Sequence, residues 1–99
     1  MSTFANRLKS TRQAAGLSQE QLGVLAGIEE ASASARLNRY ERGTRVPALD
    51  IVEHIAEALD VPLAYLYSKS DDEANLLLAF HKMSASQKSE LLKFIATMP

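Results

Sequence analysis

The chain has 99 residues, of which 46% are apolar, with 11 basic and 12 acidic side chains and no cysteine. This length supports one domain with one modest core, which excludes a two-lobed enzyme, and the lack of cysteine excludes disulfides and thiolate metal sites. No segment approaches the roughly 18 consecutive apolar residues of a membrane span, and the N-terminus lacks the apolar run of a secretion signal. We therefore expect a cytoplasmic protein without membrane contact.

The net charge of −1 hides an asymmetry along the chain. Residues 1–45 contain seven basic and four acidic side chains, a net charge of +3, whereas residues 46–99 contain four basic and eight acidic ones, a net charge of −4. The overall charge argues against nucleic acid, but a positive N-terminal half would orient the molecule in the field of DNA. Random scatter of surface charge is the alternative.

Helix signals recur along the chain, and no useful stretch alternates apolar and polar residues, so the predicted class is all-α. A first helix is expected over about residues 3–15, ended by Gly16. A second begins at Ser18, because Ser18 and Gln21 have the spacing of a capping box, and it ends at Gly27.

A third helix is expected to contain the run up to Arg42 and to end at Gly43. Its apolar residues form one buried stripe on a helical wheel, namely Ala33, Leu37 and Tyr40. Pro47 suits the first turn of a fourth helix, and Pro62 suits the start of a short fifth helix that ends near Tyr67. Five helices would thus form the first two-thirds of the chain.

The polar segment Ser68–Asp72 is predicted to be a joint, and it divides the chain into residues 1–68 and residues 69–99. Two more helices, Glu73–Met83 and about Ser86–Met98, would form a hairpin. Large apolar side chains spread over more than one face of both helices: Leu76, Leu77, Leu78, Phe80, Leu91, Leu92, Phe94, Ile95 and Met98. Such a hairpin must cover either its own bundle or a partner chain, and we favour a homodimer contact.

The segments GLSQEQLGVLAG (16–27) and RYERGTRVP (39–47) resemble the Cro/CI-type helix-turn-helix family, the XRE-family DNA-binding domains of lambda repressor-like phage repressors and small bacterial regulators. The resemblance covers the first two-thirds of the chain. It implies a five-helix bundle whose second and third helices form the motif, with the third helix in the major groove of double-stranded DNA.

The resemblance assigns base contacts to five positions of the third helix: Ser34, Ala35, Arg36, Asn38 and Arg39. Arginine can bind guanine and asparagine can bind adenine through two hydrogen bonds, so these types suit direct readout. For both arginines the alternative is a phosphate contact that carries no sequence information.

Phosphate contacts are expected at a further set of positions in and around the motif: Ser18, Gln19, Arg42, Thr44 and Arg45. For Gln19 the alternative is an ordinary early-helix residue, and for the loop residues Thr44 and Arg45 it is simple solvation. The resemblance also implies a structural pair between Glu41 and Arg12 of the first helix.

The chain departs from the family pattern between Gly27 and Glu41, where it has 13 residues and the pattern has about nine. Four added residues rotate a helix by about 400°, so the buried stripe keeps its phase if the third helix begins earlier. A longer turn is the other solution. Ala33 stands where the family has a capping Ser or Thr, and alanine cannot cap, which favours the earlier start.

We identify no catalytic or metal site, no cofactor and no small-molecule effector, because His54 and His81 have no second ligand at metal spacing and no nucleophile or phosphate-loop motif occurs. The sequence therefore predicts a sequence-specific DNA-binding transcriptional regulator and not an enzyme. A repressor that occupies a two-fold operator as a homodimer is favoured. The alternative is a protein-interaction module, such as the antitoxin of a toxin pair, in which DNA binding is secondary.

Overall fold

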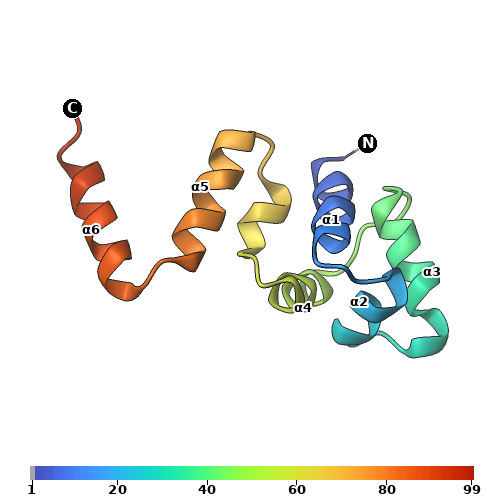
Figure 1. The fold of residues 1–99 in the computed structure, drawn as a ribbon. Helices are drawn as coiled ribbons and strands as arrows, with labels where there is room; N and C mark the ends of the chain where they lie inside the picture. The colour runs from blue at the N-terminus through green and yellow to red at the C-terminus, as the bar shows by residue number, and fades with distance from the viewer. Residues whose placement is uncertain (1) are drawn as a thin grey trace.

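A computed structural model describes residues 2–99, and every regular element in this range is helical (Figure 1). The elements follow in the order α1 (Thr3–Ala14), α2 (Gln19–Leu25), α3 (Glu30–Glu41), α4 (Leu49–Leu59), the 3-10 helix η1 (Leu63–Tyr67), α5 (Asp71–Lys82) and α6 (Ala85–Ala96). The predicted all-α class is confirmed over the described residues.

Serine side chains begin four of the helices. At α2, the Ser18 hydroxyl accepts the Gln21 N–H at 3.0 Å, while the Gln21 side chain accepts the Ser18 N–H at 2.8 Å. Ser84 and Gln87 form the same reciprocal pair at α6. The capping box predicted at Ser18 is therefore confirmed, and both boxes satisfy backbone donors that the helix itself leaves unpaired.

One core joins the first five elements. Its fully buried large side chains come from α1, α2, α3, α4 and η1, and they are Leu8, Leu22, Leu37, Val52, Ile55 and Leu66. The predicted stripe of α3 is buried as expected. Helices α2 and α3 approach very closely at Gly23. A Cβ atom added to this glycine would lie 2.7 Å from the Cβ of Ala33.

The fourth and fifth elements differ in detail from their predictions. Pro47 lies just before Ala48, the N-cap of α4, and not in the first turn. The fifth element is a 3-10 helix of five residues, since the segment between Pro62 and Ser68 is too short for more than one tight turn and 3-10 geometry is common in such connectors.

The predicted joint at 68–72 is shorter than expected, because α5 already begins at Asp71. The Ser70 hydroxyl accepts the Glu73 N–H at 3.3 Å and caps the helix. Asp71 and Asp72, which were predicted to lie in the joint, occupy the first helical turn together with Glu73, and the helix dipole favours negative charge there. Ser68 is buried, and its carbonyl accepts a 2.7 Å hydrogen bond from Nε of Arg7.

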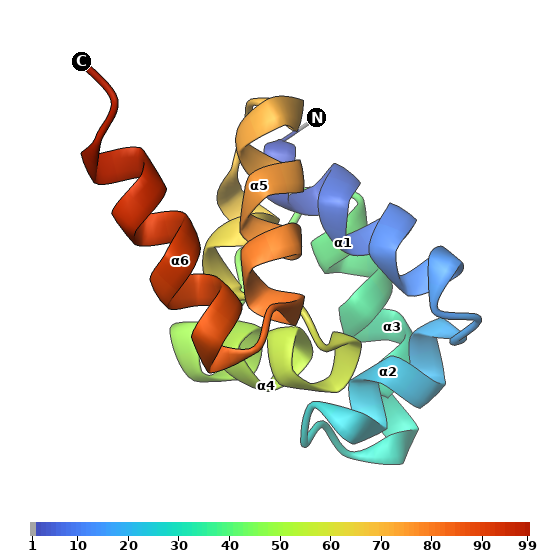
Figure 2. The same cartoon turned by 60° about the vertical axis from the view of Figure 1, so that its left-hand side comes forward.

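Helices α5 and α6 form an open hairpin. α5 lies against the bundle, where Ala74 is fully buried and Leu78 packs on the core. α6 has no buried residue, and Figure 2 shows it standing away from the bundle on the outer side of α5. The described chain is consequently elongated, with extents of 51 × 26 × 22 Å.

Candidate nucleic-acid interface

Helix α3 begins at Glu30, so the added residues lengthen the helix and leave the turn short. This outcome confirms the expectation of an earlier start. Glu29 is the N-cap and makes no side-chain hydrogen bond to the first turn. The first turn therefore carries acidic side chains, which complement the helix dipole and would repel a nearby phosphate.

The face of α3 opposite its buried stripe is open to solvent. Of the predicted base contacts, Ser34, Ala35 and Arg39 are exposed, whereas Arg36 and Asn38 are half-buried. Arg39 makes no side-chain hydrogen bond or ion pair with residues 2–99. The exposed side therefore offers small side chains near its start and a free guanidinium further along.

A buried polar network fixes α3 against α1 and α2. Arg12 forms a two-pronged ion pair with Glu41, with Nε–Oε2 at 2.6 Å and Nη2–Oε1 at 3.0 Å. Its third nitrogen donates to the carbonyl of Leu17 at 2.9 Å. The Gln19 amide donates to Oε1 of Glu41 at 3.1 Å, so the first residue of α2 is joined to the last residue of α3.

The ion pair is shielded from water, because the Glu41 side chain is 3% exposed and that of Arg12 is 12% exposed. The hydrogen bond to Glu41 raises the pKa of the Arg12 guanidinium above its ordinary value, and burial opposes that rise only in part. The Arg12 guanidinium thus stays charged at any physiological pH, and its two bonds to Glu41 hold the motif in one arrangement.

Two other predicted contact residues are engaged within α3 and the turn that follows it. Arg36 donates from Nη2 to the hydroxyl of Tyr40 at 2.8 Å. The Thr44 hydroxyl donates to the carbonyl of Arg39 at 3.3 Å, which helps to close the end of the helix. Each of these two side chains therefore already has a hydrogen-bond partner within the chain.

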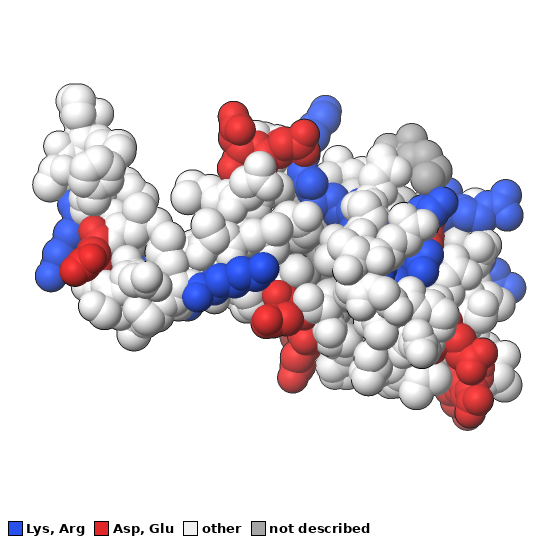
Figure 3. Space-filling view, viewed as in Figure 1, with Lys and Arg blue, Asp and Glu red and all other residues white. Residues whose placement is uncertain are grey.

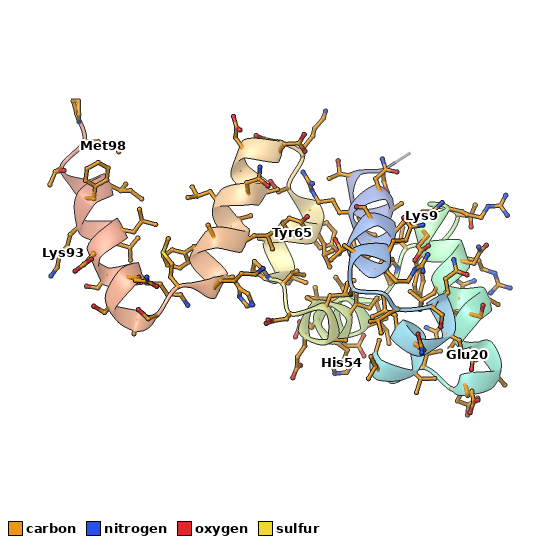
Figure 4. All side chains as sticks on the ribbon, viewed as in Figure 1. Lys9, Glu20, His54, Tyr65, Lys93 and Met98 are labelled. Carbon is orange, nitrogen blue, oxygen red and sulfur yellow. The ribbon has the colours of Figure 1, made fainter. Side chains whose placement is uncertain are left out.

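The remaining predicted phosphate contacts lie at the surface. Arg42 and Arg45 are exposed at the end of α3 and in the following turn. Ser18 is also exposed, although its oxygen already serves the cap of α2. Figure 3 shows basic side chains at the α1 and α3 end of the molecule and a separate acidic group beside them, and Figure 4 labels Glu20 where α2 meets α3.

The basic side chains of the N-terminal half do not all lie near α3. Arg7 faces the C-terminal part, where it pairs with Asp71 at 3.2 Å and lies 5.2 Å from the ring centre of Tyr65. Lys9, which we did not predict as a contact, is exposed on the α3 side of α1 (Figure 4). Its spacing of three residues from Arg12 places both on one face of α1. The same spacing in the sequence could have indicated that Lys9 lies on the α3 side.

The two histidines lie on different helices, His54 on α4 and His81 on α5. His81 hydrogen-bonds Asp60 through Nε2 at 3.0 Å, and His54 is exposed on α4. Within residues 2–99, no three His, Asp or Glu side chains are grouped so that they could hold a metal ion. None of the described helices is both long and apolar enough to cross a membrane.

Comparisons with known proteins agree with this geometry. The model of the helix-turn-helix domain family matches residues 3–66. The crystal structure of the transcriptional regulator BswR is similar over 99% of this chain and 95% of its own, with 44% sequence identity and a TM-score of 0.88. The restriction-modification controller protein C.AhdI from Aeromonas hydrophila is similar over 66% of this chain and 92% of its own, with 35% identity and a TM-score of 0.58.

A search of curated protein sequences found no significant match. The family match covers α1 to η1, which are the elements that share the core, and the similarity to BswR extends through α5 and α6. The chain belongs to the helix-turn-helix family of DNA-binding transcriptional regulators.

Proposed function

We propose that this protein is a sequence-specific transcriptional repressor that binds a two-fold operator as a homodimer. The observation that carries the proposal is the solvent-exposed face of α3, which the Arg12–Glu41 ion pair holds in place. This face presents the Arg39 side chain without a hydrogen bond or ion pair to residues 2–99. A protein bound at an operator can repress simply by occupying DNA that other proteins need.

In this proposal α3 lies in the major groove and reads bases through its exposed residues. Arg39 binds guanine, Asn38 binds adenine, and the small side chains of Ser34 and Ala35 let the helix approach the base edges. Gln19, Arg42 and Arg45 bind phosphates on the flanks and fix the register of the helix. Ser18 and Thr44 contribute hydroxyl groups at the same flanks.

Residues 1–68 would then read DNA, and residues 69–99 would join two copies. The support for the second role is the apolar surface of α6, on which Leu92 is 55% exposed and Phe94 is 61% exposed. An isolated helix of about 12 residues is marginal in water, so α6 needs a partner surface to remain folded. A second copy meets this need and supplies the second recognition helix of a two-fold operator.

Selection of DNA from a random pool by the purified protein tests the proposal. We expect an enriched sequence with two-fold symmetry and half-sites spaced by about one DNA turn, roughly 34 Å. Arg39→Ala should then reduce discrimination between cognate and scrambled DNA by about 1–3 kcal/mol, whereas Arg45→Ala should weaken binding to both equally. Enrichment of no sequence, together with a stoichiometric protein partner from the cell, would favour the antitoxin-like alternative.

A further inference from the structure

Arg36 differs from the other predicted base contacts because its guanidinium already has a partner within residues 2–99. Nη2 donates a 2.8 Å hydrogen bond to the Tyr40 hydroxyl, and the guanidinium carbon lies 5.9 Å from the centre of the Tyr40 ring. The Arg39 guanidinium makes neither kind of contact with the part of the chain that the structure describes. The two arginines that the sequence suggests for base readout are therefore held differently.

Tyr40 is a fixed anchor. Its side chain is 3% exposed, and its ring belongs to the core beneath α3. On a wheel of about 100° per residue, Arg36 lies only about 40° from Tyr40 and about 60° from the buried Ala33, whereas Arg39 lies about 100° from Tyr40. The hydrogen bond therefore holds Arg36 at an edge of α3, away from the middle of the solvent-facing side.

The dimensions of DNA indicate what a side chain at the edge of α3 would contact. An α-helix with its side chains is roughly 10–12 Å wide, and the major groove of B-DNA is about 12 Å wide. A helix of this width fills the groove, so side chains at the middle of its outer face meet base edges. Side chains at its two edges meet the phosphate backbones that form the walls of the groove.

We propose that Tyr40 is a positioning residue that holds Arg36 for a backbone phosphate, so that Arg36 strengthens binding to any sequence while Arg39 supplies sequence preference. This inference rests on the proposed placement of α3 in the major groove. The chemistry is suitable, because a guanidinium has five N–H donors and the Tyr40 hydroxyl accepts only one of them. The others remain for the oxygens of a phosphate.

The test uses the full chain, its selected operator and a scrambled duplex, each titrated at several salt concentrations. Arg36→Ala should weaken binding to both duplexes by the same factor, roughly tenfold, as expected for a lost hydrogen bond to a charged group. The slope of log K against log salt should become less negative by about one unit. Arg39→Ala is the matched control on the same helix, and its loss should fall mainly on the operator.

Tyr40→Phe isolates the hydroxyl, because the ring that packs in the core is retained. It should weaken binding to both duplexes by a smaller factor than Arg36→Ala. In a chain that already carries Arg36→Ala, it should cause no further loss, since there is no guanidinium left to position. Arg36→Lys should recover part of the affinity on both duplexes, because the positive charge remains.

Three outcomes would overturn the inference. The first is an Arg36→Ala loss confined to the operator, which would identify Arg36 as a base reader. The second is an unchanged affinity and salt slope in Arg36→Ala. The third is a Tyr40→Phe loss of equal size with and without Arg36, which would indicate a general structural role for the hydroxyl. A wild-type chain that binds neither duplex would overturn the proposed function itself.

Discussion

The two ends of this molecule are built in opposite ways. At one end, a nearly buried ion pair joins α1 to α3, and α2 approaches α3 so closely that a Cβ atom at position 23 would lie 2.7 Å from that of Ala33. At the other end, α6 has a capping box at its start but buries no side chain. The end with the DNA-reading motif is therefore fixed within one chain, whereas the far end leaves apolar side chains of α6 open to solvent.

The largest change in stability should come from removing the Arg12–Glu41 ion pair. Arg12→Met leaves the Glu41 carboxylate buried without its counter-charge, and we expect a loss of about 3–5 kcal/mol in the free energy of unfolding. For a domain of this size, a loss of about 3 kcal/mol corresponds to a fall of roughly 12–24 °C in melting temperature. Thermal unfolding followed by circular dichroism measures the change.

A second variant controls for the packing of the arginine stem. Adding Glu41→Gln to Arg12→Met removes the unpaired charge, and the double variant should recover part of the lost stability. If the double variant is as unstable as the sum of both single changes, the two residues act independently and the ion pair does not fix α3.

A smaller effect is expected at the close contact of α2 and α3. In Gly23→Ala the new Cβ would lie 2.7 Å from the Ala33 Cβ and 3.1 Å from its backbone oxygen, so the helices must move apart. Overpacking costs about 1–3 kcal/mol, and the better helix propensity of alanine returns roughly 0.5–1 kcal/mol. We therefore expect a net loss of about 1–2 kcal/mol in a chemical denaturation series.

Val24→Ala, at the exposed neighbouring position of α2, is the matched control and should change stability by no more than about 0.5 kcal/mol. A gain in stability for Gly23→Ala would show that α2 and α3 have room to separate.

The smallest effect on the stability of one chain should come from α6. Ile95→Asp replaces an exposed apolar side chain, so unfolding of the bundle at low protein concentration should change by about 0.5 kcal/mol or less. The same change should shift a dimer toward monomers, because it places a charge in an apolar contact. Light scattering over a range of protein concentrations measures the association.

Ser89→Asp adds the same charge to the polar side of α6, and it should leave association unchanged. If the wild-type chain is monomeric at tens of micromolar, or if both variants dissociate it equally, α6 does not join two copies.

Local signals in the sequence were sufficient for much of the fold. Capping boxes at Ser18 and Ser84 act within four residues, and the buried stripe of α3 follows from helical periodicity, so both could be predicted. The start of α5 differs from the prediction because a run of acidic residues suits both a solvated joint and a first helical turn, and only the cap at Ser70 distinguishes them.

Contacts between distant segments could not be predicted in the same way. Arg7 was counted with the DNA-facing charges, but it contacts Ser68 and Asp71, more than 60 residues along the chain. The bond between Arg36 and Tyr40 spans only four residues and was within reach of helical spacing. The family resemblance does not predict this bond, because it assigns a role to position 36 and does not specify the contacts of the Arg36 side chain within the protein.

The added turn at the start of α3 also bears on the length of DNA that one chain can cover. Four helical residues extend the helix by about 6 Å, which is nearly two base-pair steps of about 3.4 Å. The side chains available over that extra length are acidic or as small as Ala31. In the proposed operator, each half-site should therefore include flanking base-pair steps that this part of α3 contacts without hydrogen bonds. The small side chains leave room for methyl groups of the bases there, whereas the acidic side chains repel nearby phosphates.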